Sequence, residues 1–183
     1  MFLSLIQKRR SIRKFLKKPV EREKIDMLIE AALRAPSSMG SRPCELIIVS
    51  ERDLLGKLSM AKLHGSAFLK NVPLGLIVCA DPDKSDVWVE DASIVSIFIQ
   101  LTAESIGLRS CWIQIRERMH NESQTAQKYI SKLLSIPEKI KVESIIAVGY
   151  PDEQKPPHKK ETLQYEKVYL NSYGKSITNT GML

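Results

Sequence analysis

The spacing of apolar residues changes along the chain, and each change predicts a different element. From Arg22 to Arg34, apolar side chains recur every three to four residues, a spacing typical of an amphipathic helix. Four short runs are instead apolar almost throughout, which predicts buried strands. These runs are residues 45–50, 74–80, 108–115 and 142–148. With further helices expected over residues 2–8, after a capping box at residues 50–53, and after Asn121, the pattern predicts an α/β or α+β sandwich.

One predicted helix has an unusual composition. Residues 87–106 are apolar nearly all round the helix. A helix without a polar face is buried on several sides, either at the centre of a domain or in a subunit interface. Gly107 supplies a residue at which such a helix can end. We therefore expect a central helix in this stretch.

Composition sets broad limits on the function. The chain has 183 residues, enough for one domain with a sizeable core, and 43% of them are hydrophobic. Its net charge of +7 indicates an anionic ligand or surface, but does not separate a phosphate-bearing cofactor from nucleic acid or an acidic membrane. The 3 cysteines and 3 histidines lack the spacing of a disulfide framework or a metal site, so no metal is expected. With no signal-like start and no apolar run of membrane-spanning length, we expect a cytoplasmic protein.

The basic cluster, residues 8–15, holds three arginines, two lysines and Ser11 around two apolar anchors. Guanidinium groups bind phosphate oxygens two at a time, and a hydroxyl or backbone N–H fills the remaining acceptor sites. The cluster therefore predicts a phosphate site. Two alternatives stay open at this point: a solvated charge run at the end of a short helix, or an arm over residues 8–18 that binds nucleic acid or an anionic membrane. Aromatic residues are not interleaved in the arm for base stacking, which disfavours nucleic acid.

Two further motifs combine with the basic cluster. Residues 35–38 (Ala-Pro-Ser-Ser) open a polar loop between two prolines, and residues 107–112 (Gly-Leu-Arg-Ser-Cys-Trp) lead from the apolar helix into a strand. Residues 136–138 (Ile-Pro-Glu) and 149–151 (Gly-Tyr-Pro) follow at suitable distances. In this order and spacing, the motifs resemble those of the nitroreductase family of flavin-dependent oxidoreductases, over about residues 3–170.

The resemblance implies an α+β fold, a three-layer sandwich whose central mixed sheet is flanked by helices, in an intertwined homodimer. Two FMN molecules would lie at the dimer interface, with the helix at residues 87–106 at its core. Residues 1–170 would form the FMN-binding domain, including a C-terminal arm that crosses onto the partner and explains the weak core pattern after residue 152. Residues 171–183 are expected to be a flexible tail.

The same resemblance assigns cofactor contacts residue by residue. Those to the FMN phosphate and ribityl chain are Arg9, Arg10 and Ser11, with Lys159 or, preferably, Lys160 returning to the phosphate. Those that cover the ring or ribityl chain from the partner subunit are Pro36, Ser37, Ser38 and Met39. The residues whose backbone would meet the N5 and O4 side of the flavin ring are Trp112, Ile113 and Gln114. Arg13 should lie near the pyrimidine edge, where a fixed cation stabilises the negative charge that reduction places on the ring.

One stretch departs from the family's usual pattern and points to the substrate. After Ser-Ser the family often has Asn-x-Gln-Pro-Trp, whereas this chain has Gly-Ser-Arg-Pro-Cys at residues 40–44. Arg42 and Cys44 are therefore expected to face the substrate. Gln114 also departs from the pattern, because glycine or glutamate is common at its position.

The implied function is hydride transfer from NADH or NADPH, through N5 of the flavin, to an electron-poor acceptor such as a nitroaromatic or a quinone. The expected mechanism is ping-pong, with no side chain assigned a catalytic role because the flavin carries the chemistry. The changed residues 40–44 keep one alternative open, a flavin-binding module of the same fold with little reductase activity. Neither a nucleic-acid nor a membrane partner is expected.

Overall fold

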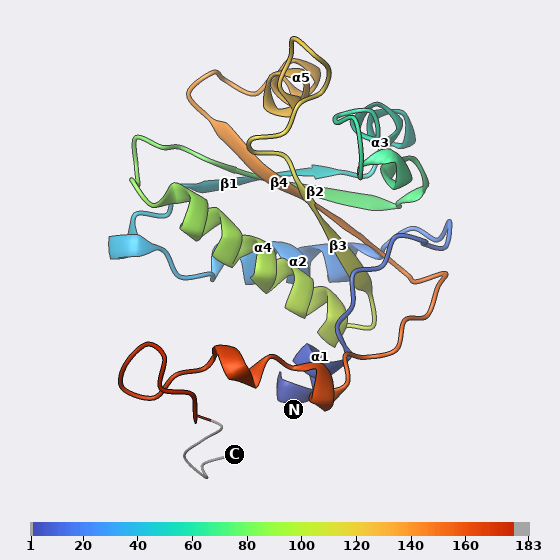
Figure 1. Cartoon of the computed structure of the whole chain (residues 1–183). Coiled ribbons are helices and arrows are strands. Elements are labelled where there is room, and N and C mark those ends of the chain that lie inside the picture. Colours follow the sequence, from blue (N-terminus) through green and yellow to red (C-terminus); the bar gives the residue numbers. More distant parts are fainter. Residues whose placement is uncertain (1, 178–183) are drawn as a thin grey trace.

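The computed structural model describes residues 2–177 and shows a four-stranded sheet between two layers of helices (Figure 1). The strands are β1 (Cys44–Val49), β2 (Leu74–Ala80), β3 (Arg109–Gln114) and β4 (Lys141–Gly149), in the order β1-β2-β4-β3. Every neighbouring pair is antiparallel, so the expected mixed sheet is wrong for these strands. Each strand enters the sheet from the end opposite to its neighbour. In the described part of the chain, the only parallel pairing is a single bridge between Ser11 and Ser110.

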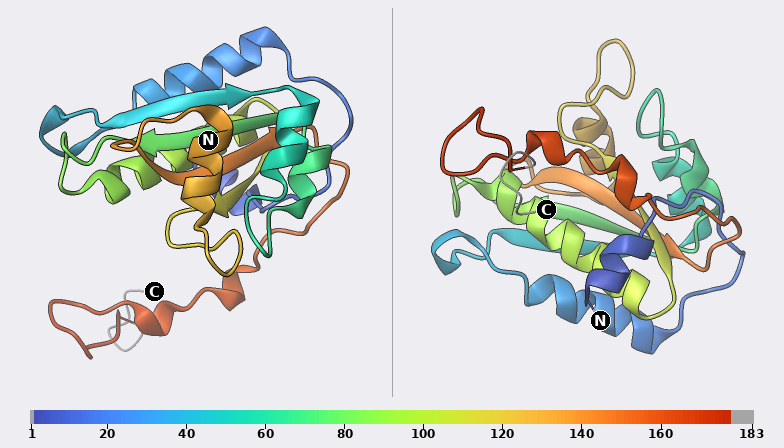
Figure 2. Two further views of the ribbon diagram at one scale, coloured as in Figure 1. Left: turned by 90° about the horizontal axis from the view of Figure 1, so that it is seen from above. Right: turned by 60° about the horizontal axis from the view of Figure 1, so that its bottom comes forward.

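The helices lie on both faces of this sheet. They are α1 (Phe2–Lys8), α2 (Arg22–Leu33), α3 (Arg52–Leu58), α4 (Trp88–Ser105) and α5 (Ala126–Leu134). Figures 1 and 2 show α3 and α5 over one face and α2 and α4 over the other, which confirms the expected three-layer α+β sandwich. None of the helices in residues 2–177 is long and apolar enough to cross a membrane.

Each face of the sheet has its own hydrophobic core. Side chains alternate between the two faces of a strand, so neighbouring residues join different cores. Ile77 of β2 packs with Leu55 of α3 and Ile130 of α5, whereas Leu76 packs with Ile99 of α4 and with the buried face of α2. Because β2 is buried on both faces, its sequence is a continuous apolar run, and its predicted bounds are confirmed.

The ends of the helices follow local backbone chemistry in two cases and depart from prediction in a third. Gly107 adopts φ +79°, and the N–H of Leu108 donates to the Ala103 carbonyl at 2.8 Å, which ends α4 as predicted. The hydroxyl of Thr125 accepts from a backbone N–H in the first turn of α5. The capping box predicted for α3 is wrong, because Glu51 takes the N-cap position and makes no side-chain capping hydrogen bond.

The basic cluster crosses the edge and end of the sheet in an extended conformation. The N–H of Ile12 donates to the Ser110 carbonyl of β3 at 3.1 Å, and the N–H of Leu16 donates to the Tyr150 carbonyl just past β4 at 2.9 Å. A Cβ on Gly149 would lie 3.1 Å from the Phe15 ring and closer still to the ring of Pro73, so the close approach of these segments requires glycine.

The C-terminal arm, residues 152–177, leaves the sandwich and extends away from it (Figure 2). Short 3₁₀ turns at Lys160–Thr162 and Tyr165–Lys167 give it local order. The hydrogen bonds recorded for residues 157–175 join residues of the arm to one another. Of the predicted flexible tail, residues 178–183 lie outside the described residues.

Candidate active site

Positive charge gathers where the basic cluster meets β3. The pKa of the Cys111 thiol reports this charge. Burial raises the pKa, and four neighbouring groups oppose the rise: the charges of Arg13 and Lys155, a hydrogen bond with Ser11 and the charge of Arg9. Ser11 pairs with Ser110 next to Cys111, and the charges of Arg9, Arg13 and Lys155 all reach this part of the strand. Three of them, Arg9, Ser11 and Arg13, were predicted to be together.

The outer edge of β3 lies beside this group. β3 is an edge strand, and in a β-ladder the backbone groups of alternate residues point to the same side. The Ser110 carbonyl points outward, since it accepts from the N–H of Ile12, so the backbone groups of Trp112 and Gln114 also point outward. The Gln114 carbonyl accepts from Lys62 Nζ at 3.1 Å, and burial, with the charge of Arg118, lowers the pKa of Lys62.

Hydrogen bonds hold the Gln114 amide in one orientation. Trp112 Nε1 donates to Gln114 Oε1 at 2.8 Å, and Gln114 Nε2 donates to Glu143 Oε1 at 3.0 Å. Glu143 is 3% exposed, burial raises its pKa, and its Oε2 has no hydrogen-bond partner among the described residues. The side chain of Ile113 is buried in the core under α3 and α5, so at this residue only the backbone is left to contact a ligand.

The start of the arm adds two residues that the sequence analysis missed. Glu153 accepts from the N–H groups of Arg13 at 2.6 Å and Lys14 at 3.2 Å, and these hydrogen bonds lower its pKa. Lys155 Nζ donates to the Ser11 carbonyl at 2.8 Å. Lys155 lies only four residues after Pro151, but nothing in its local sequence predicts the fold-back that brings it to Ser11.

The other basic residues assigned to the phosphate lie less centrally. Arg10 Nη1 donates to the Pro156 carbonyl, so its guanidinium is engaged by the arm of its own chain. Lys159 and Lys160 lie exposed at the first 3₁₀ turn of the arm, and the described residues hold no side-chain contact of either with the basic cluster. Within one chain, the structure therefore does not bring Lys159 and Lys160 to Arg9.

The loop at residues 36–44 is held at a different place. The N–H of Ser38 donates to Asp91 Oδ1 at 2.8 Å, and the Ser85 hydroxyl donates to Asp91 Oδ2 at 2.8 Å. Met39 and Arg42 adopt positive φ angles of 51° and 47°, and the Met39 side chain is fully exposed. Asp91 was also missed, although an acidic residue in an otherwise apolar helix is a usable signal.

The predicted substrate residues lie in this loop. Arg42 and Cys44 line a small cavity of about 70 Å³, together with Pro36, Ser37 and Asp91. Burial, with the charge of Asp91, raises the pKa of Cys44 to about 12. Cys44 is therefore a protonated, unreactive thiol at neutral pH.

The loop and the basic cluster lie at opposite ends of α4. Asp91, which holds the loop, is in the first turn of this helix, and Glu104, whose carboxylate feels the charges of Arg109 and Arg9, is in the last. α4 has 18 residues and is therefore about 27 Å long. One chain thus presents the loop and the cluster to two separate places, as Figure 1 shows at the two ends of α4.

Together these features make a candidate anion site on the edge of an α+β sandwich. Cations and a hydroxyl lie next to outward N–H donors of an edge strand, a donor set suited to a phosphate and to a planar group that accepts hydrogen bonds. Among residues 2–177, no group of three or more histidine, cysteine, aspartate or glutamate side chains is placed to hold a metal ion.

Comparison with known proteins agrees with this description. A family model described as the nitroreductase family matches residues 6–66. An FMN-dependent nitroreductase of known structure from Clostridium difficile R20291 shares 46% sequence identity, with a TM-score of 0.92 over 93% of this chain and 99% of that chain. A protein from Archaeoglobus fulgidus, provisionally named NADH dehydrogenase/NAD(P)H nitroreductase, is 36% identical over 157 residues, which are 84% of this chain and 87% of that protein. The FMN reductase (NAD(P)H) of Bacillus subtilis is 26% identical over 186 residues, covering 88% of this chain and 72% of that protein.

The chain therefore belongs to the nitroreductase family, and the resemblance of its motifs is confirmed. The three-layer α+β fold implied by that resemblance is confirmed as well, apart from the direction of the strands, whereas the intertwined homodimer stays a prediction. The roles of the individual site residues stay predictions.

Proposed function

We propose that this protein, an FMN-dependent NAD(P)H oxidoreductase, transfers hydride from a reduced nicotinamide to an electron-poor acceptor by a ping-pong mechanism. The observation that carries the proposal is the grouping of Arg9, Ser11, Arg13 and Lys155 beside the outward N–H donors of β3. The names of the relatives, an FMN-dependent nitroreductase and an FMN reductase among them, support the same cofactor.

The donor set fits FMN. Arg9 and Ser11 would hold the phosphate, because a guanidinium and a hydroxyl satisfy several of its oxygens. The N–H groups of Trp112 and Gln114 would meet the ring edge that carries N5 and O4. Arg13 would lie toward the pyrimidine edge, and Lys155 adds to the same positive field.

Bound FMN would supply acceptance and release of hydride at N5. The residues of the chain then act by position and charge. Glu153 holds the backbone N–H of Arg13, and the guanidinium of Arg13 would place a cation where negative charge develops. The Trp112–Gln114–Glu143 hydrogen bonds fix the β3 edge, so its donors need no rearrangement during the reaction. The loop at residues 36–44 of a second subunit would exclude water from the site.

The surface of α4 supports a homodimer. Its buried side chains include Asp91, Ser96, Gln100 and Glu104, whereas Ile97 and Phe98 are 38% and 37% exposed. A helix that buries polar groups and exposes large apolar ones in a single chain requires a further apolar surface to cover it. Because α4 also separates the loop from the basic cluster, a second copy supplies both the cover for this face and the missing side of the cofactor site.

The acceptor would bind where the nicotinamide binds first, against the ring. We propose a nitroaromatic or a quinone, with Arg42 of the covering loop contacting it. Cys44 is less suited to this role than its position in the sequence predicts, because it lines the cavity next to Asp91. The cytoplasm stays the expected compartment.

The visible spectrum of the purified protein tests the proposal. We expect a yellow protein that NADH or NADPH bleaches without oxygen, and whose colour menadione or p-nitrobenzoate then restores. A colourless protein that ignores FMN in titration contradicts the proposal. A protein that binds FMN but is reduced by neither nicotinamide is the flavin-binding module instead, the alternative that the changed residues 40–44 keep open.

A further inference from the structure

A cavity of about 420 Å³ lies at the end of the sheet where β1 finishes and β2 begins. Four segments form it: the turn after the basic cluster, α2, the connection from β1 into α3, and the stretch that leads into β2. Its volume falls within the usual range for small-molecule sites, about 300–1,000 Å³. The proposed oxidoreductase activity does not use this cavity.

The floor and the rim of the cavity differ in chemistry. The floor is apolar, with Leu55 and Leu74 fully buried beneath it. The rim carries three cations, Lys17, Arg52 and Lys70, and no acidic residue lines the cavity. In the described part of the chain, none of these three side chains makes a hydrogen bond or an ion pair. Three unpaired cations from different segments thus surround one apolar hollow.

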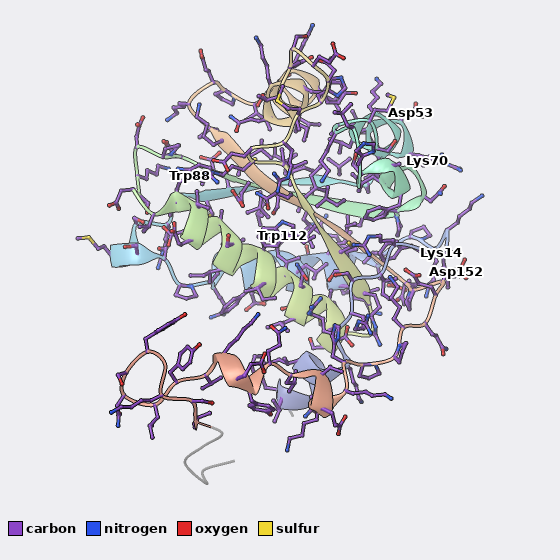
Figure 3. All side chains as sticks on the ribbon, in the orientation of Figure 1. Lys14, Asp53, Lys70, Trp88, Trp112 and Asp152 are labelled. Carbon is purple, nitrogen blue, oxygen red and sulfur yellow. The ribbon has the colours of Figure 1, made fainter. Side chains whose placement is uncertain are left out.

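Packed side chains separate this cavity from the cofactor site. Pro73, which lines it, packs against Gly149 beside Phe15, the residue that anchors the basic cluster. Figure 3 shows Lys70 on the same side of the molecule as Lys14 and Asp152, where the basic cluster passes. The cavity therefore lies next to the cofactor site without opening into it.

We propose that this cavity binds a small organic anion, a phosphate monoester or a carboxylate, with its apolar body on the Leu55 and Leu74 floor and its charged group between Lys17, Arg52 and Lys70. Apolar burial supplies part of the affinity, because the apolar side chains of Ile25 and Pro73, which also line the cavity, are only half-buried and the ligand would cover them. The three cations favour a negatively charged ligand, since their mutual repulsion is unfavourable without an anion between them. A neutral ligand of the same shape would gain only the apolar part.

Calorimetric titration of the FMN-saturated protein with hexyl phosphate, hexanoate and hexanol tests this proposal. Saturation with FMN closes the other phosphate site to the probe. We expect hexyl phosphate to bind most tightly, hexanoate less tightly and hexanol least, with the two anions losing affinity as salt rises. Amide chemical-shift changes should centre on Asn71, Val72, Leu74 and Val20.

Variants locate the binding. Arg52→Gln and Lys70→Gln should each weaken hexyl phosphate binding about two- to fivefold, the range of exposed ion pairs. The double variant should lose more than either single variant. Ser50→Trp, at an exposed position on the rim, should fill the cavity and block all three probes. Lys132→Gln, an exposed charge on α5, is the matched control and should change nothing.

Equal binding of hexanol and hexyl phosphate would overturn the proposal, because the cations would then select nothing. Unchanged binding in Ser50→Trp or in the double variant would overturn it as well, since the probes would then lie elsewhere. The proposal would also be overturned if neither hexyl phosphate nor hexanoate bound at millimolar concentration.

Discussion

The basic cluster and the loop at residues 36–44 are both assigned to the cofactor, yet this chain holds them in opposite ways. Backbone hydrogen bonds tie the cluster to β3 and to the segment after β4, and Glu153 and Lys155 of the arm bind it from the other side. The loop is held by two hydrogen bonds, from the N–H of Ser38 to Asp91 and from the N–H of Asp81 to the Pro43 carbonyl, and it leaves Met39 fully exposed.

This difference separates a part of the proposed site that one chain holds by its own contacts from a part that, in the proposed dimer, a second chain would supply. The phosphate side is built from contacts that already exist within the chain. The covering side is displayed about one helix length away, at the far end of α4. We expect changes at the cluster to act on the cofactor directly, and changes at the α4 surface to act by removing the second chain.

The largest expected effect is therefore at the α4 surface. Phe98→Glu places a carboxylate on the proposed interface, where burying it costs several kcal/mol for each subunit. We expect the variant to sediment as a monomer and to bind FMN at least about a hundredfold more weakly, because it loses the covering loop of the partner.

Phe98→Leu is the matched control, since it keeps an apolar side chain, and it should stay dimeric. In the unaltered protein, the melting temperature should rise with protein concentration. A Phe98→Glu monomer that binds FMN as tightly as the unaltered protein would break the comparison, because one chain would then hold the whole site.

Arg13→Gln should have the next largest effect, and it should appear in the rate of reduction. A cation that stabilises charge developing on the ring contributes to the transition state more than to binding of the oxidised cofactor. We expect hydride transfer from the nicotinamide to slow about thirtyfold to a hundredfold, with oxidised FMN binding little changed. Stopped-flow absorbance of the reductive half-reaction measures this.

Lys14→Gln is the control for charge alone, because Lys14 neighbours Arg13 and shares the carboxylate of Glu153. It should slow the reaction much less. Equal effects of the two variants would mean that general positive charge, and not the position of Arg13, accounts for the rate.

Arg9→Gln and Arg10→Gln should differ in how much they weaken FMN binding, which extends the comparison to two positions within the basic cluster. Arg9→Gln should weaken FMN binding about tenfold to a hundredfold, the size of a lost charge-assisted hydrogen bond, and leave riboflavin binding nearly unchanged. Arg10→Gln should cost less, because its Nη1 is already engaged by the Pro156 carbonyl. Fluorescence titrations with FMN and riboflavin test both, and a larger loss in Arg10→Gln would reverse the assignment.

The sequence predicted those parts of the molecule that depend on local pattern. β2 has the predicted bounds because burial on both faces leaves a continuous apolar run, and Gly107 ends α4 because the backbone there needs a left-handed residue. The direction of the strands could not be predicted, since it depends on the path of the connections. Lys155 and Glu153 reach the site only because the chain after β4 folds back beside Phe15, which no local pattern encodes.

Glu143 provides the smallest effect and a test of whether the β3 side is complete in one chain. Burial raises its pKa, so between the ordinary value near 4.5 and the raised value the folded chain holds a proton that the unfolded chain has lost. The free energy of unfolding therefore falls as pH rises through that window. Glu143→Gln removes this dependence and still offers an oxygen to Gln114, so its advantage should grow with pH and then level off above the raised pKa of Glu143. Urea unfolding from pH 4 to 8 measures the difference, with exposed Glu122→Gln as the flat control. Because Gln114, the hydrogen-bond partner of the Glu143 side chain among residues 2–177, lies in the same chain, the same pH dependence should persist in the Phe98→Glu monomer. If it vanished there, the β3 side would also depend on the second chain, and the contrast between the two sides of the site would fail.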